Sequence, residues 1–492
     1  MPYTSVEFID DDILLEIFNC YRLDEESWNH RLGWRKLSHV CRRWRNLIYG
    51  CASSLGMHIL CTNGTPTVDT LDHLPSLPLV VDYQDATQTM SAKDKLGVSR
   101  ALHLRARVLR VVLSISPVAF KMLLLLMVDS FPILEHLYLS STVRDEDAGL
   151  IFPETFMAPN LRHLTLLGIG LPTGLPLLSS TLSLVSLTLA DIQPSGYFIP
   201  KHLVARLRLL PQLEELSIIF AITIPRPSIE GELLGTLEPT PATLPVLKRL
   251  TFRGVSSYLE RLLAQISTPL LEHLNIALFN QATFALPHLS RFTNVPEELE
   301  HPIASVIFEY DAVSVIMNER GQERADGPPS SSFRVMCRQF EWQVDCAAQI
   351  CNALTPVLSR VEGLTLDFGG QRTPTDWQDG AVDVGSWRAL LRPFVAVKKL
   401  RVCHALAWEL SFALQPDRAG LDPMMLPSLR ELAPQLEAEH AINAFGSFVD
   451  ARLIAGQPVH LSLSPVPRAQ PVFFWSNTAP PKRIWRHVHS PV

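Results

Sequence analysis

The feature that most constrains this chain is a short leucine-rich segment that recurs from about residue 100 onward. Each copy carries apolar residues at positions 0, 3 and 5, and most copies follow a proline. The strong copies begin at Leu134, Leu161, Leu184, Leu213, Leu247 and Leu271, and further ones at Ile303, Val361, Val397 and Leu429. Leucine supplies 77 of the 492 residues. Such a repeat predicts units that stack one on the next rather than a chain folded around a single centre.

Each copy is expected to form one short parallel strand whose leucines point inward, followed by a helical or irregular return. The first strong copies start 27, 23, 29, 34 and 24 residues apart, so the repeat is uneven. The sequence therefore predicts an α/β fold, an irregular leucine-rich-repeat-like solenoid of short parallel strands.

The first fifty residues follow a different pattern. Ile13, Leu14, Ile17 and Phe18 have helical spacing and follow three aspartates, which favour a helix start. A second helix is expected over roughly 33–49. We expect an all-α domain over 1–52, a linker over 53–100 and the repeat domain over 101–464. A polar loop is expected at about 319–332, and a Pro-rich, basic, disordered tail over 465–492.

The N-terminal segment resembles an F-box. Asp12, Leu14, Leu15, Ile17 and Phe18 match the D-x-(I/L)-L-x-x-I-F core of that family, and Leu37, Val40, Cys41 and Trp44 match its later L-x-x-V-C-x-x-W. Ile9-Asp10 stands where the family has Leu-Pro. Segments farther along, such as FEWQVDCAAQICNALTPVLSRVEGLTL, are similar to the expanded F-box families of mushroom-forming (basidiomycete) fungi.

The resemblance implies a non-catalytic substrate receptor of a Skp–cullin–F-box ubiquitin ligase, cytoplasmic or nuclear. The F-box would dock a Skp-type adaptor, and through it a cullin–RING ligase, while the repeat domain would bind a protein substrate. Substrate contacts are expected on the strand face and on the loop 319–332. The adaptor-binding residues would be Ile9, Ile13, Leu14, Ile17, Phe18, Leu37, Val40, Cys41, Trp44 and Leu47. In the alternative, a repeat-domain interaction scaffold, the same helices only cap the solenoid.

Composition and motifs argue against other classes of function. The net charge of -6 disfavours a nucleic-acid binder that works by bulk charge. The apolar stretch 111–128 is interrupted by Pro117 and Lys121, so we expect no membrane span and no membrane partner. No phosphate loop, nucleophile elbow or zinc-protease motif occurs, so we expect no enzyme, cofactor or metal. Cys346, Cys351 and Cys403 are predicted to pack in the core.

Overall fold

The computed structural model describes residues 9–23, 33–51, 55, 58–63, 71, 77–84, 91–141, 150–172, 176–221, 241–279, 283–293, 302–318, 330–369, 383–415 and 425–462. The chain divides into two compact units. The first unit comprises Met1–Val295 and Pro329–Phe333, and the second comprises Pro296–Pro328 and Arg334–Val492.

In the described part of its N-terminal region, the first unit contains the short helices α1 (Asp11–Leu23), α3 (Gly33–Ser38) and α4 (Arg42–Gly50). Asp11 and Asp12 occupy the first turn of α1, where negative charge complements the helix dipole. Cys41 caps α4, because its sulfur accepts a hydrogen bond from the backbone N–H of Trp44. The helices expected at the N-terminus are therefore present, with a break between α3 and α4 at Cys41.

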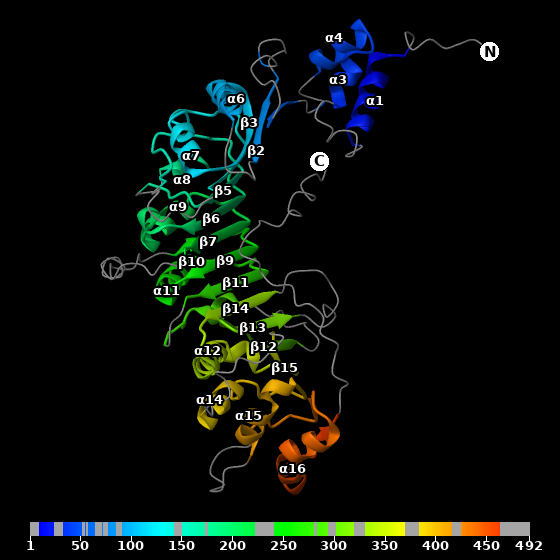
Figure 1. Ribbon diagram of the computed structural model, residues 1–492, viewed down its shortest axis with the longest axis vertical. Helices are drawn as coiled ribbons and strands as arrows, with labels where there is room; N and C mark the ends of the chain where they lie inside the picture. The colour runs from blue at the N-terminus through cyan, green and yellow to red at the C-terminus, as the bar shows by residue number, and fades with distance from the viewer. Residues whose placement is uncertain are drawn as a thin grey trace, which may run out of the picture. The chain divides into compact units, whose positions relative to one another are not determined.

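A parallel sheet forms the rest of the first unit, with each strand beside the next one along the chain (Figure 1). Its strands are β1 (Ile59–Thr62), β2 (Leu79–Gln84), β3 (Val108–Ile115), β4 (His136–Ser141), β5 (His163–Leu167), β6 (Ser186–Ile192), β7 (Glu215–Phe220), β9 (Arg249–Gly254) and β11 (His273–Leu278). A separate two-stranded parallel sheet contains β8 (Ala242–Thr243) and β10 (Ile266–Ser267).

The central leucines of the repeat align across this sheet. Leu137, Leu164, Leu187, Leu216, Leu250 and Leu274 are paired from strand to strand in unbroken register. All six side chains are buried. The predicted α/β solenoid of parallel strands with inward-facing leucines is thereby confirmed.

Return segments on one side of the sheet cover these leucines (Figure 1). They contain α6 (Ala92–His103), α7 (Pro117–Leu124), α8 (Leu177–Ser180), α9 (Pro200–Leu207) and α11 (Ser256–Ala264). Short 3-10 turns lie at η2 (Arg105–Arg107), η3 (Pro194–Gly196) and η4 (Leu289–Phe292). Within the described residues, no helix is both long enough and apolar enough to cross a membrane.

The second unit repeats the plan, and its helices α12 (Phe340–Ala353) and α16 (Ala438–Ile454) are longer than the return helices of the first unit. Its strands are β12 (Ile303–Phe308), β13 (Ala312–Asn318), β15 (Gly363–Phe368), β16 (Lys399–Val402), β17 (Glu431–Pro434) and β18 (His460–Leu461). Its helices are α12 (Phe340–Ala353), α13 (Thr355–Leu358), α14 (Val384–Leu391), α15 (His404–Leu414) and α16 (Ala438–Ile454). All of these strands pair in parallel except β13, which runs antiparallel to β12. The residues of β14 (Ser331–Met336) are divided between the two units.

The structure corrects three expectations. Strands β1 and β2 lie inside the range 53–100 that we expected to be a linker, so the sheet begins earlier. The copy starting at Ile303 is displaced by two residues, because Ala304 and Val306 pair with Leu364 and Leu366. The end of the expected loop 319–332 is strand, since β14 starts at Ser331. Residues 319–329 of that loop and the tail 465–492 lie outside the described residues.

The alignment of the inner leucines predicts a sharp contrast between neighbours on β6. Leu187→Ala should lower the free energy of unfolding by ~2–5 kcal/mol, because it empties a fully buried site. Thr188→Ala, one residue along on the half-buried outer face, is the matched control and should cost much less. Urea denaturation measures both, and equal losses would contradict the assigned sidedness of the strand.

Candidate interaction surfaces

The three N-terminal helices share a small apolar core. Leu14 and Phe18 on α1 are buried, as is Ile48 on α4. The ring of Trp44 meets that of Phe18 edge-on, with 4.9 Å between ring centroids and an interplanar angle of 67°. Edge-to-face packing of this kind stabilises aromatic pairs beyond the area they bury. Trp44 therefore helps to join α4 to α1.

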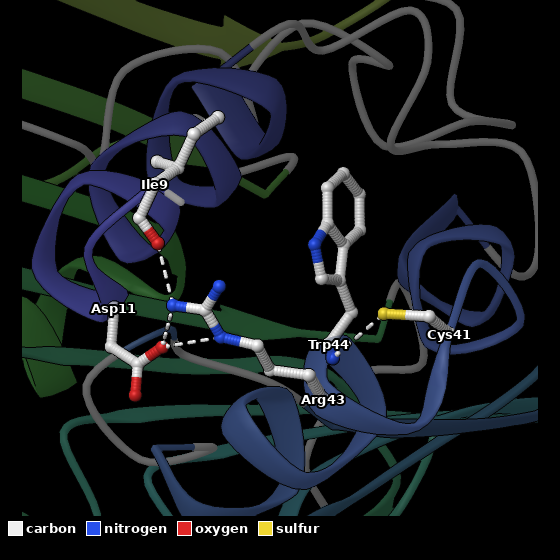
Figure 2. A network of polar contacts seen from close by, with 5 residues as sticks. All are labelled: Ile9, Asp11, Cys41, Arg43 and Trp44. Carbon is white, nitrogen blue, oxygen red and sulfur yellow. Dashed lines mark hydrogen bonds and ion pairs between the residues drawn. The ribbon is translucent and has the colours of Figure 1, made fainter. Parts of the chain in front are cut away.

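A polar network fixes the start of α1 against α4 (Figure 2). The guanidinium of Arg43 donates through Nη2 to the backbone carbonyl of Ile9 at 2.5 Å and to Asp11 Oδ1 at 2.6 Å. Its Nε donates to the same Asp11 oxygen at 3.0 Å. Asp11 and Arg43 are partly exposed, so the ion pair itself stabilises the fold little. Its consequence is positional, because it ties the chain that enters α1 to the side of α4.

Three apolar side chains of this helical group face outward. Ile13 is 55% exposed and Ile17, one turn later on α1, is 44% exposed. Val40, at the break between α3 and α4, is 59% exposed. Ile13 and Ile17 lie one turn apart on α1 and are here called the α1 face.

The ten residues predicted to bind an adaptor thus separate into groups. Leu14 and Phe18 lie in the interior and cannot offer a contact surface, since the core of so small a unit needs them. Ile9, Leu37, Trp44 and Leu47 are half-buried, and Cys41 is an exposed helix cap. Ile13 and Ile17 form the α1 face, and Val40 is exposed between α3 and α4. Sequence reasoning missed the role of Arg43, whose contacts reach 32 and 34 residues back along the chain.

The outer face of the first unit's sheet carries rows of polar side chains. In one row the register aligns hydroxyl and amide groups, namely Tyr138, Thr165, Thr188, Ser217, Thr251 and Asn275. Neighbouring strands lie ~4.8 Å apart, so the row is a regular series of hydrogen-bonding groups. The row lies on the strand face where substrate contacts are expected, and that expectation stays a prediction.

A second row on the same face begins with Arg110, His136 and His163, which are neighbours on β3, β4 and β5. The two imidazole rings stack with 4.4 Å between centroids and 3° between planes. Burial, together with the neighbouring His163, Arg110 and Arg162, lowers the pKa of His136 to about 3. Burial, Arg162 and Arg110 also lower the pKa of His163, against a smaller opposing effect of Glu214. Both rings are therefore neutral at physiological pH.

Farther along, the second row holds residues that link successive strands. Ser186 donates to Glu215 at 3.3 Å, and Glu215 forms an ion pair with Arg249. Similar cross-strand pairs occur in the second unit, where Lys399 lies 2.7 Å from Glu431 and lowers the pKa of that carboxyl. These partly exposed pairs hold side chains in position more than they add stability.

The cysteines that the sequence predicts to pack in the core are buried. Cys346 and Cys351 are buried on α12, as predicted for core residues. Burial raises the pKa of the Cys403 thiol to about 11, so this side chain is not a thiolate at neutral pH. In the described part of the chain, no three His, Cys, Asp or Glu side chains gather in a way that would hold a metal ion.

The aligned strands and their helical returns define the chain as a leucine-rich-repeat-like α/β repeat protein. No family model matches the sequence, and no curated protein matches it. Among solved structures, the chain is similar to the leucine-rich repeat-containing protein LegL7 from Legionella pneumophila, at 12% sequence identity. That similarity covers 82% of this chain and 98% of the other, with a TM-score of 0.23. The class assigned here rests on the strand register of this chain.

The stacked histidines predict a loss of stability in mild acid. The pKa of His136 is about 3 in the folded chain and about 6.5 in the unfolded chain. Between these pH values the imidazole is protonated in the unfolded chain but stays neutral in the folded one, which favours unfolding. The free energy of unfolding should therefore fall as the pH drops from 6.5 toward 3. In the His136→Gln variant, the free energy of unfolding should fall less steeply between pH 7 and pH 5, as measured by urea denaturation at each pH. Parallel slopes for the two proteins would contradict this account.

Proposed function

We propose that this chain is a non-catalytic substrate receptor of a Skp–cullin–F-box ubiquitin ligase. The N-terminal helices dock the Skp-type adaptor, and the repeat domain binds a protein substrate. The observation that carries the proposal is the separation of apolar residues within the helices. Leu14, Phe18 and Ile48 suffice for a core, while the α1 face is left exposed.

The α1 face has the character of a docking surface. Scattered single apolar residues on a protein surface need no explanation, but an apolar group beside an already formed core favours a partner. Ile13 and Ile17 share one side of α1, one helical turn apart. The Arg43 contacts to Ile9 and Asp11 hold this helix in one orientation, which lowers the entropy lost when a partner binds.

The repeat domain requires no catalytic residue for this function. A receptor works by effective concentration, since one surface is held by the ligase while another holds the substrate near the charged ubiquitin carrier. The outer rows of hydroxyl, amide and charged side chains supply hydrogen-bonding positions for a protein substrate, and a cytoplasmic or nuclear location goes with this role. A cap for the solenoid is the competing role for the N-terminal helices, and it needs no adaptor.

The double variant Ile13→Glu, Ile17→Glu tests the adaptor contact. Two carboxylates on an apolar docking face leave buried charges unpaired, so adaptor binding should fall by at least about tenfold. The exposed side chains contribute little to the core, so circular dichroism and the melting temperature should stay unchanged. The measurement is co-purification of the full chain with a Skp adaptor and a cullin, with Asn46→Ala on exposed α4 surface as the control. Undiminished adaptor binding by the double variant would show that the α1 face is not the adaptor-binding surface.

Unlike the double glutamate variant, Trp44→Ala should change the stability of the N-terminal helices. It removes a ring that packs on Phe18, so adaptor binding and the stability of the helices should fall together. Because Trp44 is half-buried, the cost should stay below the ~3–5 kcal/mol of a fully buried aromatic residue. The repeat domain should melt as in the wild type if the helices dock a partner, whereas a cap role predicts that the repeats lose stability too.

A further inference from the structure

Helix α7 is apolar on both of its sides. Its inner side contributes buried residues to the solenoid core, namely Ala119, Phe120, Leu123 and Leu124. On its outer side Val118 is 73% exposed, Met122 63% and Leu125 72%. Their spacing of four and three residues places them in one stripe along the helix. A helix that is apolar all round is normally buried on all sides, yet this one lies at the surface.

The return helices α9 and α11 of the first unit do not share this property. On α9 the exposed residues are Lys201, His202 and Ala205, and on α11 the exposed residue is Ser257. Both helices bury one apolar side against the sheet and turn a polar or small-residue side outward. The solenoid therefore needs only one apolar side from each return helix, and the outer stripe of α7 serves some other purpose.

Helix α6 extends the stripe with an apolar residue and adds positive charge. Figure 1 shows α6 and α7 as consecutive return helices on the same side of the sheet. On α6, Leu96 is 60% exposed, and Lys93 and Lys95 beside it are exposed. Lys121 is exposed within the α7 stripe itself. We call Lys93, Lys95, Leu96, Val118, Lys121, Met122 and Leu125 the α6–α7 face.

The acidic groups nearest to this face already have partners. Asp94 accepts a hydrogen bond from the Ser91 hydroxyl at 2.6 Å, within the cap of α6. Asp129, just beyond α7, forms an ion pair with Arg105. Asp94 keeps its negative charge, since the hydroxyl that donates to it is neutral, so Lys93, Lys95 and Lys121 together leave the α6–α7 face with a net positive charge around its apolar stripe.

We propose that the α6–α7 face binds the surface of a membrane that contains anionic lipids. Val118, Met122 and Leu125 would enter the boundary between headgroups and acyl chains, where surface-bound apolar helix faces lie ~5–10 Å deep. The lysine stems would pack along the apolar surface while their ammonium groups meet the lipid phosphates.

The lysines favour an anionic membrane over another protein as the partner of the α6–α7 face. Protein interfaces are depleted in lysine, whereas anionic membrane surfaces attract it. Attachment from the surface needs no spanning helix, so it agrees with the absence of such a helix among the described residues. The proposal revises the sequence-based expectation of no membrane partner, which considered only a span. It is independent of the proposed receptor function and, with it, would bring substrate capture to a membrane surface.

The test is sedimentation of the full chain with vesicles of phosphatidylcholine, with and without phosphatidylserine. The wild type should bind the phosphatidylserine vesicles more tightly, and added salt should weaken binding because it shortens the range of electrostatic attraction. The variant Val118→Ser, Met122→Ser, Leu125→Ser should bind at least about tenfold more weakly. Leu270→Ser, which changes an equally open leucine several repeats away, is the control and should bind as the wild type does.

A second variant keeps the test decisive if the triple serine variant melts early. Lys93→Ala, Lys95→Ala, Lys121→Ala leaves the apolar residues in place and should lose about fivefold in affinity for each lysine that reaches the surface. No wild-type binding to phosphatidylserine vesicles at low salt would overturn the proposal, and so would unchanged binding by both variants. A wild-type dimer that the serine variant converts to a monomer in light scattering would also overturn it, because a second copy would then cover the face.

Discussion

The rest of this structure depends on the strand-to-strand alignment of the inner leucines. Each of these side chains is buried by its counterparts on the two neighbouring strands and by the return segment above it, so no repeat is stable without its neighbours. This column of apolar contacts fixes the register of the parallel strands. Because side chains alternate along a strand, it also fixes which residues face outward. The alignment of polar side chains in rows on the outer face therefore follows from the alignment of the inner leucines.

The sequence predicted this column well wherever leucine filled it and poorly elsewhere. Val108, Val111 and Leu113 satisfy the same 0, 3, 5 spacing on β3, but their mixed identity hid the copy among other apolar residues. In the copy at Ile303, apolar residues occupy both sides of β12, so spacing alone could not select the inward set. The antiparallel strand β13 had no signal, since residues 300–353 contain no leucine and so lack the repeat from which the other strands were predicted.

The N-terminal helices show a similar limit. The adjacent pairs Ile13–Leu14 and Ile17–Phe18 are all apolar, and helical spacing groups each residue with its counterpart one turn away. Which pair enters the core depends on where α4 lies, and that is decided by long-range contacts such as that of Trp44 with Phe18. The Arg43 contact with Ile9 is equally long-range and carries no local sequence pattern. Periodicity predicted the helices, and only tertiary packing could divide their residues between interior and surface.

The polar rows on the outer strand face have an evolutionary consequence. Tyr138, Thr165, Thr188 and their aligned neighbours contribute little to the buried column, so each is free to change without disturbing the register that the leucines impose. Substitutions can thus accumulate in the outer rows one residue at a time, while the scaffold stays folded at every step.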